Sequence, residues 1–250
     1  MSAKSLYGMI LSVSNIIRDL ETAGMRVEVG DDFSEYRNLR HAQEDRPMYP
    51  MFDVASSYVD QSNGFWVCGF DKDDNLIHTQ AIRLLDLTGV SLRQHMRVHR
   101  HKYITPNTTP DPDRTFYTQP PALRTISGKV CYHGDFWLKG GDEGHRSQGL
   151  TPLLSRIVFE LALKTWAPNY IFAFVSKPVA SKGMHFRCGY NHCEPGCWIG
   201  PDNQVTDEDC LIWMTTKDLI HFIESEPHSL AQETKSPISG SSLRSVGIGG

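Results

Sequence analysis

The feature that most constrains this chain is a run in which a strand pattern, a glycine-rich turn, a helix pattern and a second strand pattern follow one another. Residues 128–138 (GKVCYHGDFWL) alternate between two faces, and this spacing predicts His133 and Asp135 on the same face. Aliphatic side chains in residues 150–162 recur on one face of a helix. Residues 170–175 (YIFAFV) are apolar throughout and predict a buried strand. This alternation predicts an α/β or α+β architecture.

The turn between the first strand and the helix covers residues 140–151 and reads GGDEGHRSQGLT. A glycine-rich turn that enters a helix leaves successive backbone N–H groups without partners, and the positive end of the helix dipole lies beside them. Together these groups form an anion site. The turn carries neither the Gly-Lys-Ser/Thr of a nucleotide-binding P-loop nor the G-x-G-x-x-G of a dinucleotide fold.

The rest of the chain continues the alternation of helices and strands. We expect further helices near residues 1–24, 31–42, 51–59, 91–102, 177–188 and 216–224, and further strands near residues 25–30, 65–70, 76–87 and 209–215. Residues 103–125 hold five prolines and predict a long loop, either a functional lid or a disordered segment. From Ser225 onward the chain is rich in serine and glycine and has no aromatic residue, which predicts a disordered tail.

Composition limits the classes of function. A net charge of −4 argues against a chain built as a whole to bind nucleic acid. The apolar segment 6–17 is shorter than the roughly 20 residues of a membrane span, and no cleavage signal follows it. Six cysteines in 250 residues fall short of the density of a disulfide scaffold. We therefore expect a cytoplasmic protein with reduced thiols.

The turn also carries a family resemblance. Its end resembles the R/Q-x-x-G-x-G/A turn of the GNAT acyltransferase superfamily, which holds the pyrophosphate of acetyl-CoA or another acyl-CoA through backbone amides. The matching residues are Arg146, Ser147, Gln148, Gly149, Leu150 and Thr151. Residues 170–175 resemble the family's fifth strand, which separates from the fourth to admit the pantetheine arm. Residues 183–190 (GMHFRCGY) resemble a signature that usually ends in Gly-Phe, and the hairpin 65–87 fits the second and third strands.

The resemblance implies a fold and an activity. It implies a single GNAT-like domain over residues 25–224, with a mixed central sheet of about 6–7 strands flanked by helices, after a helical segment 1–24 and before the tail 225–250. It implies an N-acyltransferase that moves an acyl group, in the first place acetyl, from CoA to an amine lying under the loop 103–125. The chain departs from the family at Thr151, where the turn has Gly or Ala, and in the long segment 88–127.

Three alternatives stay open. The first is a plain α/β domain with a glycine-rich loop, and the second is a non-catalytic module of the same fold that binds a ligand. The third is an enzyme similar to acyl-homoserine-lactone synthases, which take acyl groups from an acyl carrier protein. That similarity rests on Phe52-Asp53, Tyr58-Val59 and residues 82–85, and the Trp-Glu-x-Ser-Arg segment of those synthases is missing.

Acylation of an amine needs a base to remove the ammonium proton and an acid to protonate the departing thiolate. The resemblance places the base near the strand that leads into the turn, so Asp135 and His133 are candidates, with Glu143 as a weaker one. The acid is usually a tyrosine four residues before the glycine of Gly-Phe. That position here is His185, whose imidazole titrates near neutral pH, and Tyr190 is the alternative.

Two further clusters carry other hypotheses. His185, Cys188, His192, Cys193 and Cys197 lie close in sequence, but the C-x4-C-x3-C spacing lacks the C-x2-C of structural zinc sites, so we expect no metal. The basic residues of segment 93–102 suit a CoA phosphate, an acidic carrier protein or a solvated helix face, and we expect no nucleic acid or membrane partner. The expected partner is a small-molecule amine, and a homodimer stays open.

Overall fold

The structure, a computed structural model, describes residues 2–41, 46–105, 111–118, 120–140 and 149–225. Its centre is a seven-stranded sheet in the order β1-β2-β3-β5-β6-β10-β7, in which β5 and β6 are parallel and the other neighbours are antiparallel. The strands are β1 (Arg26–Gly30), β2 (Gly64–Phe70), β3 (Leu76–Ser91), β5 (Ser127–Leu138), β6 (Tyr170–Ser176), β7 (His192–Glu194) and β10 (Asp209–Thr215). The predicted α/β fold with a mixed sheet is confirmed.

A small three-stranded sheet lies beside the main one. It consists of β4 (Phe116–Tyr117), β8 (Trp198–Ile199) and β9 (Val205–Asp207), in the order β4-β8-β9. Short 3₁₀ helices connect its surroundings: η1 (Arg100–Lys102), η2 (Pro112–Arg114), η3 (Pro121–Arg124) and η4 (Pro201–Asn203). The described part of the proline-rich segment 103–125 is therefore ordered.

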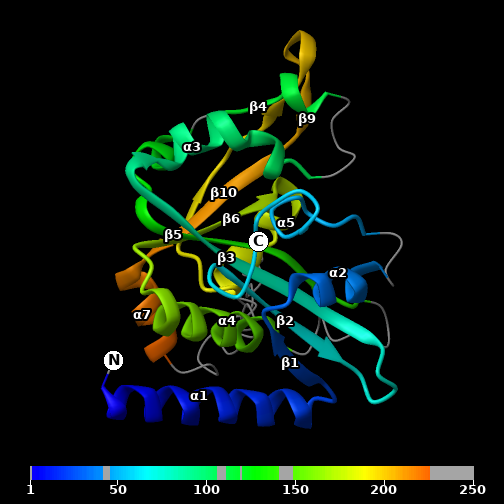
Figure 1. Cartoon of the computed structure of the whole chain (residues 1–250), viewed down its shortest axis with the longest axis vertical. Helices are drawn as coiled ribbons and strands as arrows, with labels where there is room; N and C mark the ends of the chain where they lie inside the picture. The colour runs from blue at the N-terminus through cyan, green and yellow to red at the C-terminus, as the bar shows by residue number, and fades with distance from the viewer. Residues whose placement is uncertain (1, 42–45, 106–110, 119, 141–148, 226–250) are drawn as a thin grey trace, which may run out of the picture.

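Helices cover both faces of the main sheet (Figure 1). One face carries α1 (Ala3–Thr22), α4 (Thr151–Trp166) and α7 (Thr216–Glu224), and the other carries α2 (Phe33–His41) and α3 (Leu92–His99). Two short helices, α5 (Lys177–Ser181) and α6 (Met184–Arg187), follow β6. Each face of the sheet has its own hydrophobic core. We call the face that carries α4 the α4 side and the face that carries α2 the α2 side.

The central helix α4 forms where the helix pattern predicts it. Pro152 lies in the first turn, where its missing N–H costs no hydrogen bond, and Ala167 in a left-handed conformation (φ +47°) ends the helix. Leu154, Ile157 and Val158 are fully buried against the sheet. Helix α1 packs on the same core.

Polar contacts fix α1 against α4. The Ser12 hydroxyl donates to the Glu160 carboxylate at 2.5 Å, and the Lys164 ammonium donates to the Ser5 hydroxyl at 2.7 Å. Ile16 and Leu20 of α1 are buried in the α4-side core. Within the described residues, no helix combines the length and apolarity that crossing a membrane requires.

Two predicted helices differ from the structure. Residues 51–59 form turns, and the Asp53 side chain accepts from the Ala55 amide, a local bond that competes with helix formation. The predicted helix 177–188 is broken into α5 and α6 at Gly183, which has φ +71°. The predicted disordered tail lies outside the described residues from 226 onward.

Candidate functional site

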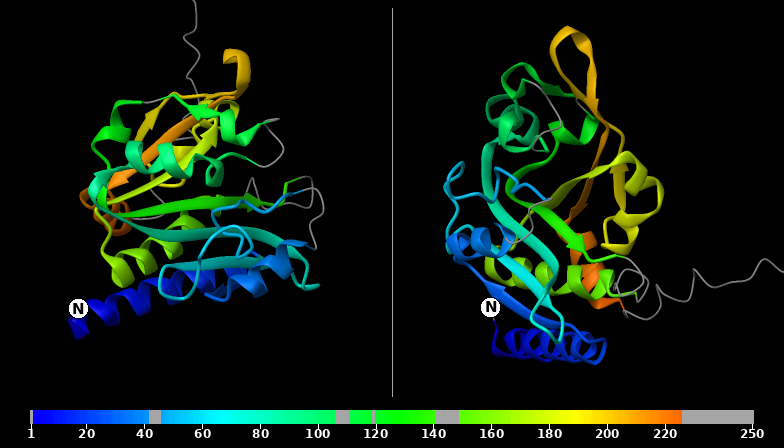
Figure 2. Two further views of the ribbon diagram at one scale, coloured as in Figure 1. Left: turned by 45° about the horizontal axis from the view of Figure 1, so that its top comes forward. Right: turned by 90° about the vertical axis from the view of Figure 1, so that its right-hand side faces the viewer.

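The two parallel strands at the centre of the sheet separate after a short pairing. β5 and β6 pair over residues 130–132 and 170–172, and beyond these positions each stays paired only with its outer neighbour, β3 or β10. The right-hand view of Figure 2 shows the two strands diverging. A cavity of about 420 Å³ lies between them, lined by residues 133–137 of β5 and 173–176 of β6. This is the separation that the family resemblance implies for these two strands.

The lining of the cavity draws on both hydrophobic cores. Ala173 and Tyr190, which line it, belong to the core on the α4 side. Tyr103 and Tyr132, which also line it, belong to the core on the α2 side. The side chains that line the cavity therefore come from both faces of the sheet.

A chain of hydrogen bonds connects α4 to the cavity. The side-chain amide of Gln80 donates to the Leu154 carbonyl in the first turn of α4 at 2.8 Å, so the other end of this amide, Oε1, faces His133 Nε2 at 3.1 Å. Oε1 only accepts, and His133 Nε2 therefore carries the proton. His133 Nδ1 is then the acceptor for the Tyr190 hydroxyl at 2.9 Å.

Burial holds both rings of this pair in their neutral forms. It lowers the pKa of His133 to about 3 and raises the pKa of Tyr190 well above its ordinary value. Gly189 positions Tyr190: its φ is +91°, and a Cβ there would lie 2.7 Å from the Phe222 ring. The Gly-Tyr end of the predicted signature thus places a neutral phenol at the cavity wall.

Asp135 does not share a face with His133. Two residues of β5, Asp135 and Phe136, lie opposite the single Gln80 of β3, so the strand has a β-bulge, and Asp135 takes a left-handed φ of +53°. His133 packs edge-on against Phe159 of α4, with ring centroids 5.2 Å apart. The Asp135 carboxylate points to the α2 side, so the same-face prediction from strand spacing is wrong.

The Asp135 carboxylate is fully buried and engaged by three side chains. The Tyr36 hydroxyl donates to Oδ2 at 2.5 Å, the Arg40 Nε donates to Oδ2 at 2.7 Å, and an Arg46 nitrogen donates to Oδ1 at 3.2 Å. Arg40 and Arg46 line the cavity with Asp135. Burial lowers the pKa of Arg46 to about 10, so this guanidinium stays charged at neutral pH.

His185 lies away from the cavity lining. It is a buried residue of α6, and burial lowers its pKa. Its neighbours Met184 and Cys188 line the cavity. Of the two residues predicted as the acid, the structure brings Tyr190 and not His185 to the cavity wall.

The structure describes only part of the turn that is predicted to bind an anion. Arg146, Ser147 and Gln148 lie outside the described residues, as does Glu143. Gly149 has a left-handed φ of +73°, and Leu150 and Thr151 begin α4, whose first amides donate no capping hydrogen bond to a side chain of the described residues. The helix start therefore offers backbone donors to an anion, and the Leu154–Gln80–His133 chain connects this first turn to the cavity.

Sequence reasoning missed Asp209, the first residue of β10. It is 5% exposed, lines the cavity with Asp207, and accepts the Trp198 indole N–H on Oδ2 at 2.9 Å. Burial, with the nearby Asp207 charge, raises its pKa to about 6. The only sequence signal was an acidic residue at the start of an apolar strand.

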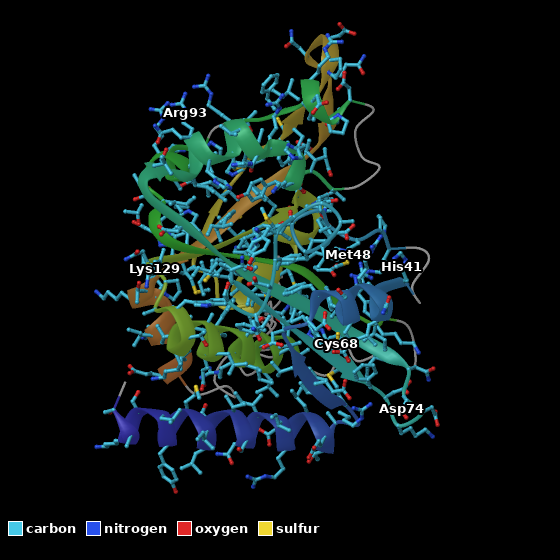
Figure 3. The ribbon with its side chains drawn as sticks, viewed as in Figure 1. His41, Met48, Cys68, Asp74, Arg93 and Lys129 are labelled. Atoms are coloured by element: carbon cyan, nitrogen blue, oxygen red, sulfur yellow. The ribbon has the colours of Figure 1, made fainter. Side chains whose placement is uncertain are left out.

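Of the His/Cys cluster at residues 185–197, only Cys188 is among the residues that line the cavity, and the basic segment 93–102 lies outside it. Figure 3 shows Arg93 projecting from the outer side of α3, and with Arg97 and Arg100 it lines a separate groove. In the described part of the chain, no three or more His, Cys, Asp or Glu side chains are grouped so that they could hold a metal ion.

No protein-family model matches this chain, and no curated protein matches it. Solved structures do. FeeM, an N-acyl amino acid synthase from uncultured soil microbes, matches with a TM-score of 0.47 and 12% identity over 84% of this chain and 97% of its own. The aminoglycoside acetyltransferase AAC(6')-Ib, solved with coenzyme A and kanamycin, matches with a TM-score of 0.41 and 12% identity over 79% of this chain and 98% of its own.

A third similar structure is the spermidine/spermine N-acetyltransferase SpeG from Vibrio cholerae in mutant forms. It has a TM-score of 0.41 and 8% identity, and the match covers 80% of this chain and 98% of that one. By description, two of these structures are acetyltransferases and FeeM is an N-acyl amino acid synthase. At these identities the similarity concerns the fold alone.

Proposed function

We propose that this protein is an N-acyltransferase that moves an acyl group, in the first place acetyl, from CoA to an amine. The observation that carries the proposal is the cavity between β5 and β6, which is lined from both faces of the sheet and is connected to the start of α4 by the Gln80–His133 chain. A pantetheine arm is long and narrow and needs such a slot. Its pyrophosphate needs backbone donors at the slot's end.

The donor would lie on the α4 side. Residues 146–151 would hold the pyrophosphate, with Gly149, Leu150 and Thr151 supplying the start of α4. The facing edges of β5 and β6 no longer pair with each other beyond Tyr132 and Phe172, so their backbone groups can bind the amides of pantetheine. This arrangement would bring the thioester beside Tyr190.

Tyr190 is our choice for the group that assists the leaving sulfur. In the reaction the amine nitrogen attacks the thioester carbon, the C–S bond breaks, and the sulfur leaves with the electron pair and takes a proton. The Tyr190 hydroxyl can turn about its C–O bond from His133 to the sulfur and donate a hydrogen bond to the developing thiolate. We propose that His133 orients Tyr190 and that Asp135 fixes the bulge rather than acting as the base.

Two measurements test the proposal. Calorimetry with CoA and with acetyl-CoA measures binding, and a thiol-release assay with acetyl-CoA and n-butylamine, putrescine, leucine and glucosamine measures transfer. We expect binding of both thioester and thiol forms and release of CoA with at least one amine. Absence of CoA binding would overturn the proposal, and binding without transfer to any amine would favour a non-catalytic module. A preference for an acyl carrier protein over CoA would favour a carrier-dependent synthase.

A further inference from the structure

The cavity has a carboxylate on the α2 side that the proposed donor site leaves unused. Asp209 is 5% exposed and lies in the cavity lining. Among the described residues, the only side chain that hydrogen-bonds to its carboxylate is Trp198, which donates to Oδ2. No ion pair joins this carboxylate to a cation within the described residues. Burying a charged carboxylate without a cation is costly, so a cationic ligand would stabilise the charged form of Asp209.

Three tyrosines and a second aspartate surround Asp209. Tyr117 of β4 donates its hydroxyl to the Asp209 carbonyl at 2.7 Å, so it fixes the backbone and leaves the carboxylate in the cavity. Asp207 adds a second negative charge at the same wall. The phenols of Tyr49 and Tyr132 line the cavity within the field of both Asp209 and Asp135.

The described residues next to Asp209 along the chain place no further charge in the cavity. Glu208, between the two aspartates, is exposed and pairs with Lys177 at 2.7 Å outside the cavity lining. Cys210, the next residue along β10, has its thiol pKa raised by burial. Asp207 and Asp209 thus supply two carboxylates to the cavity lining, and the guanidinium groups of Arg40 and Arg46 in the same lining contact Asp135.

We propose that Asp209 binds the ammonium group of the acceptor and takes its proton, so that the acceptor is a primary alkylamine that enters from the α2 side. This inference rests on the proposed acyl transfer. The acceptor then reaches the thioester carbon from the face opposite the donor, through the gap between β5 and β6. The carboxylate of Asp209, unlike that of Asp135, has room for this proton, because Asp135 is already held by Tyr36, Arg40 and Arg46.

The proton balance is complete. The ammonium gives one proton to the Asp209 carboxylate, and the neutral nitrogen attacks the thioester carbon. The C–S bond breaks as the amide forms, and the second proton of the nitrogen goes to the departing sulfur beside Tyr190. Asp209 then returns its proton to water. The products are the amide, the free thiol and one proton.

The ionisation of Asp209 suits this task. Burial and the Asp207 charge raise its pKa to about 6, so at neutral pH it is ionised and yet basic enough to take a proton during the reaction. An ammonium in the cavity stabilises the carboxylate and lowers this pKa.

The test compares Asp209→Asn with Glu208→Gln, a matched loss of one charge outside the cavity. We expect Asp209→Asn to lower kcat/KM for n-butylamine by about 100-fold or more and to remove the acidic limb of the pH profile. With aniline, which is already neutral at pH 7, the loss is expected to be only a few-fold. Glu208→Gln is expected to stay within about two-fold of the unchanged protein, and Asp207→Asn to move the acidic limb to lower pH.

A second readout does not depend on transfer. With carboxyl-¹³C aspartate, the unchanged protein should show one signal with a midpoint near 6, absent in Asp209→Asn, and n-butylamine should lower that midpoint. Equal losses with butylamine and aniline, or an acidic limb retained in Asp209→Asn, would overturn the inference. If the unchanged protein binds no CoA, the proposed function fails by itself. The butylamine titration then decides whether Asp209 is an amine site, and an unmoved midpoint rejects it.

Discussion

Burial decides which side chains along the cavity are neutral and which are charged. His133 and Tyr190 are held neutral by burial and by one hydrogen bond between them. Asp209 keeps a charge at neutral pH only at a cost, because its surroundings include one indole donor and a second carboxylate. Two predictions about single side chains follow from this contrast.

The first concerns the pair at the cavity wall. Tyr190→Phe removes the donor to the buried His133 Nδ1 and should destabilise the fold by about 1–3 kcal/mol. The same change should lower transfer by about 100-fold with CoA binding retained, because the phenol acts on the leaving sulfur. His185→Ala should change transfer only a few-fold. The opposite order of losses in kcat/KM would return the acid role to His185.

The second concerns the pH dependence of stability. Asp209 has a pKa of about 6 in the folded chain against an ordinary 3.8, so the folded state binds its proton more tightly than the unfolded state. The carboxylate therefore weakens folding as the pH rises from about 4 to 6, by up to about 3 kcal/mol above that range. Urea unfolding should show Asp209→Asn more stable than the unchanged protein at pH 8, with the difference gone at pH 4. A gain that is equal at both pH values would contradict the pKa assignment.

At the scale of elements, the bulge in β5 decides which side chains reach which face. It turns Asp135 toward α2, where Arg40 and Arg46 come from outside the sheet to meet it. Before the bulge, the side chains of β5 alternate regularly between the two faces, and His133 lies on the α4 side. One extra residue thus distributes two polar side chains over two faces.

The contact between the β5 bulge and α2 should depend on the charge of Asp135. Asp135→Asn removes the carboxylate that two guanidinium groups contact, and the side chains of Asp135 and Arg40 are 0% and 2% exposed. Removal of one partner of a buried pair typically costs about 3–5 kcal/mol. The exposed turn variant Asp73→Asn should stay within about 0.5 kcal/mol of the unchanged protein. Chemical denaturation of both variants checks this, and equal stabilities would show that the pair does not hold α2 to the bulge.

Sequence patterns predicted the helices and strands that depend on local periodicity. They failed for side chains whose position depends on residues far away in the sequence. The α4 and β6 patterns are set by their own side chains, so both were predicted. The face of Asp135 depends on how β5 pairs with Gln80 of β3, a residue far away in the sequence. The spacing of residues within β5 carries no information about this pairing. Asp209 was missed because its burial depends on Trp198 and Tyr117, which meet it only in the folded chain.

At the scale of the whole molecule, the cavity is lined from both faces of the sheet, and its lining includes the small side chain of Ala173. Ala173→Leu should fill part of this cavity without disturbing the paired strands around it. We expect transfer and CoA binding to fall by at least about tenfold. The midpoint of the Asp209 carboxyl titration should stay near 6. Ala55→Leu on the exposed surface is the control, and unaltered binding in Ala173→Leu would place the donor elsewhere.

The short pairing of β5 with β6 also divides the sheet mechanically. One half of the sheet consists of β1, β2, β3 and β5, and the other consists of β6, β10 and β7. Among the described residues, only three residue pairs, between β5 and β6, join the two halves. Local opening of a protein follows the weakest seam, so amide exchange along the facing edges should report on this seam before the outer ladders open. A molecule bound between β5 and β6 would contact both halves of the sheet and hold them together. Its binding energy would then appear as slower exchange on both edges at once.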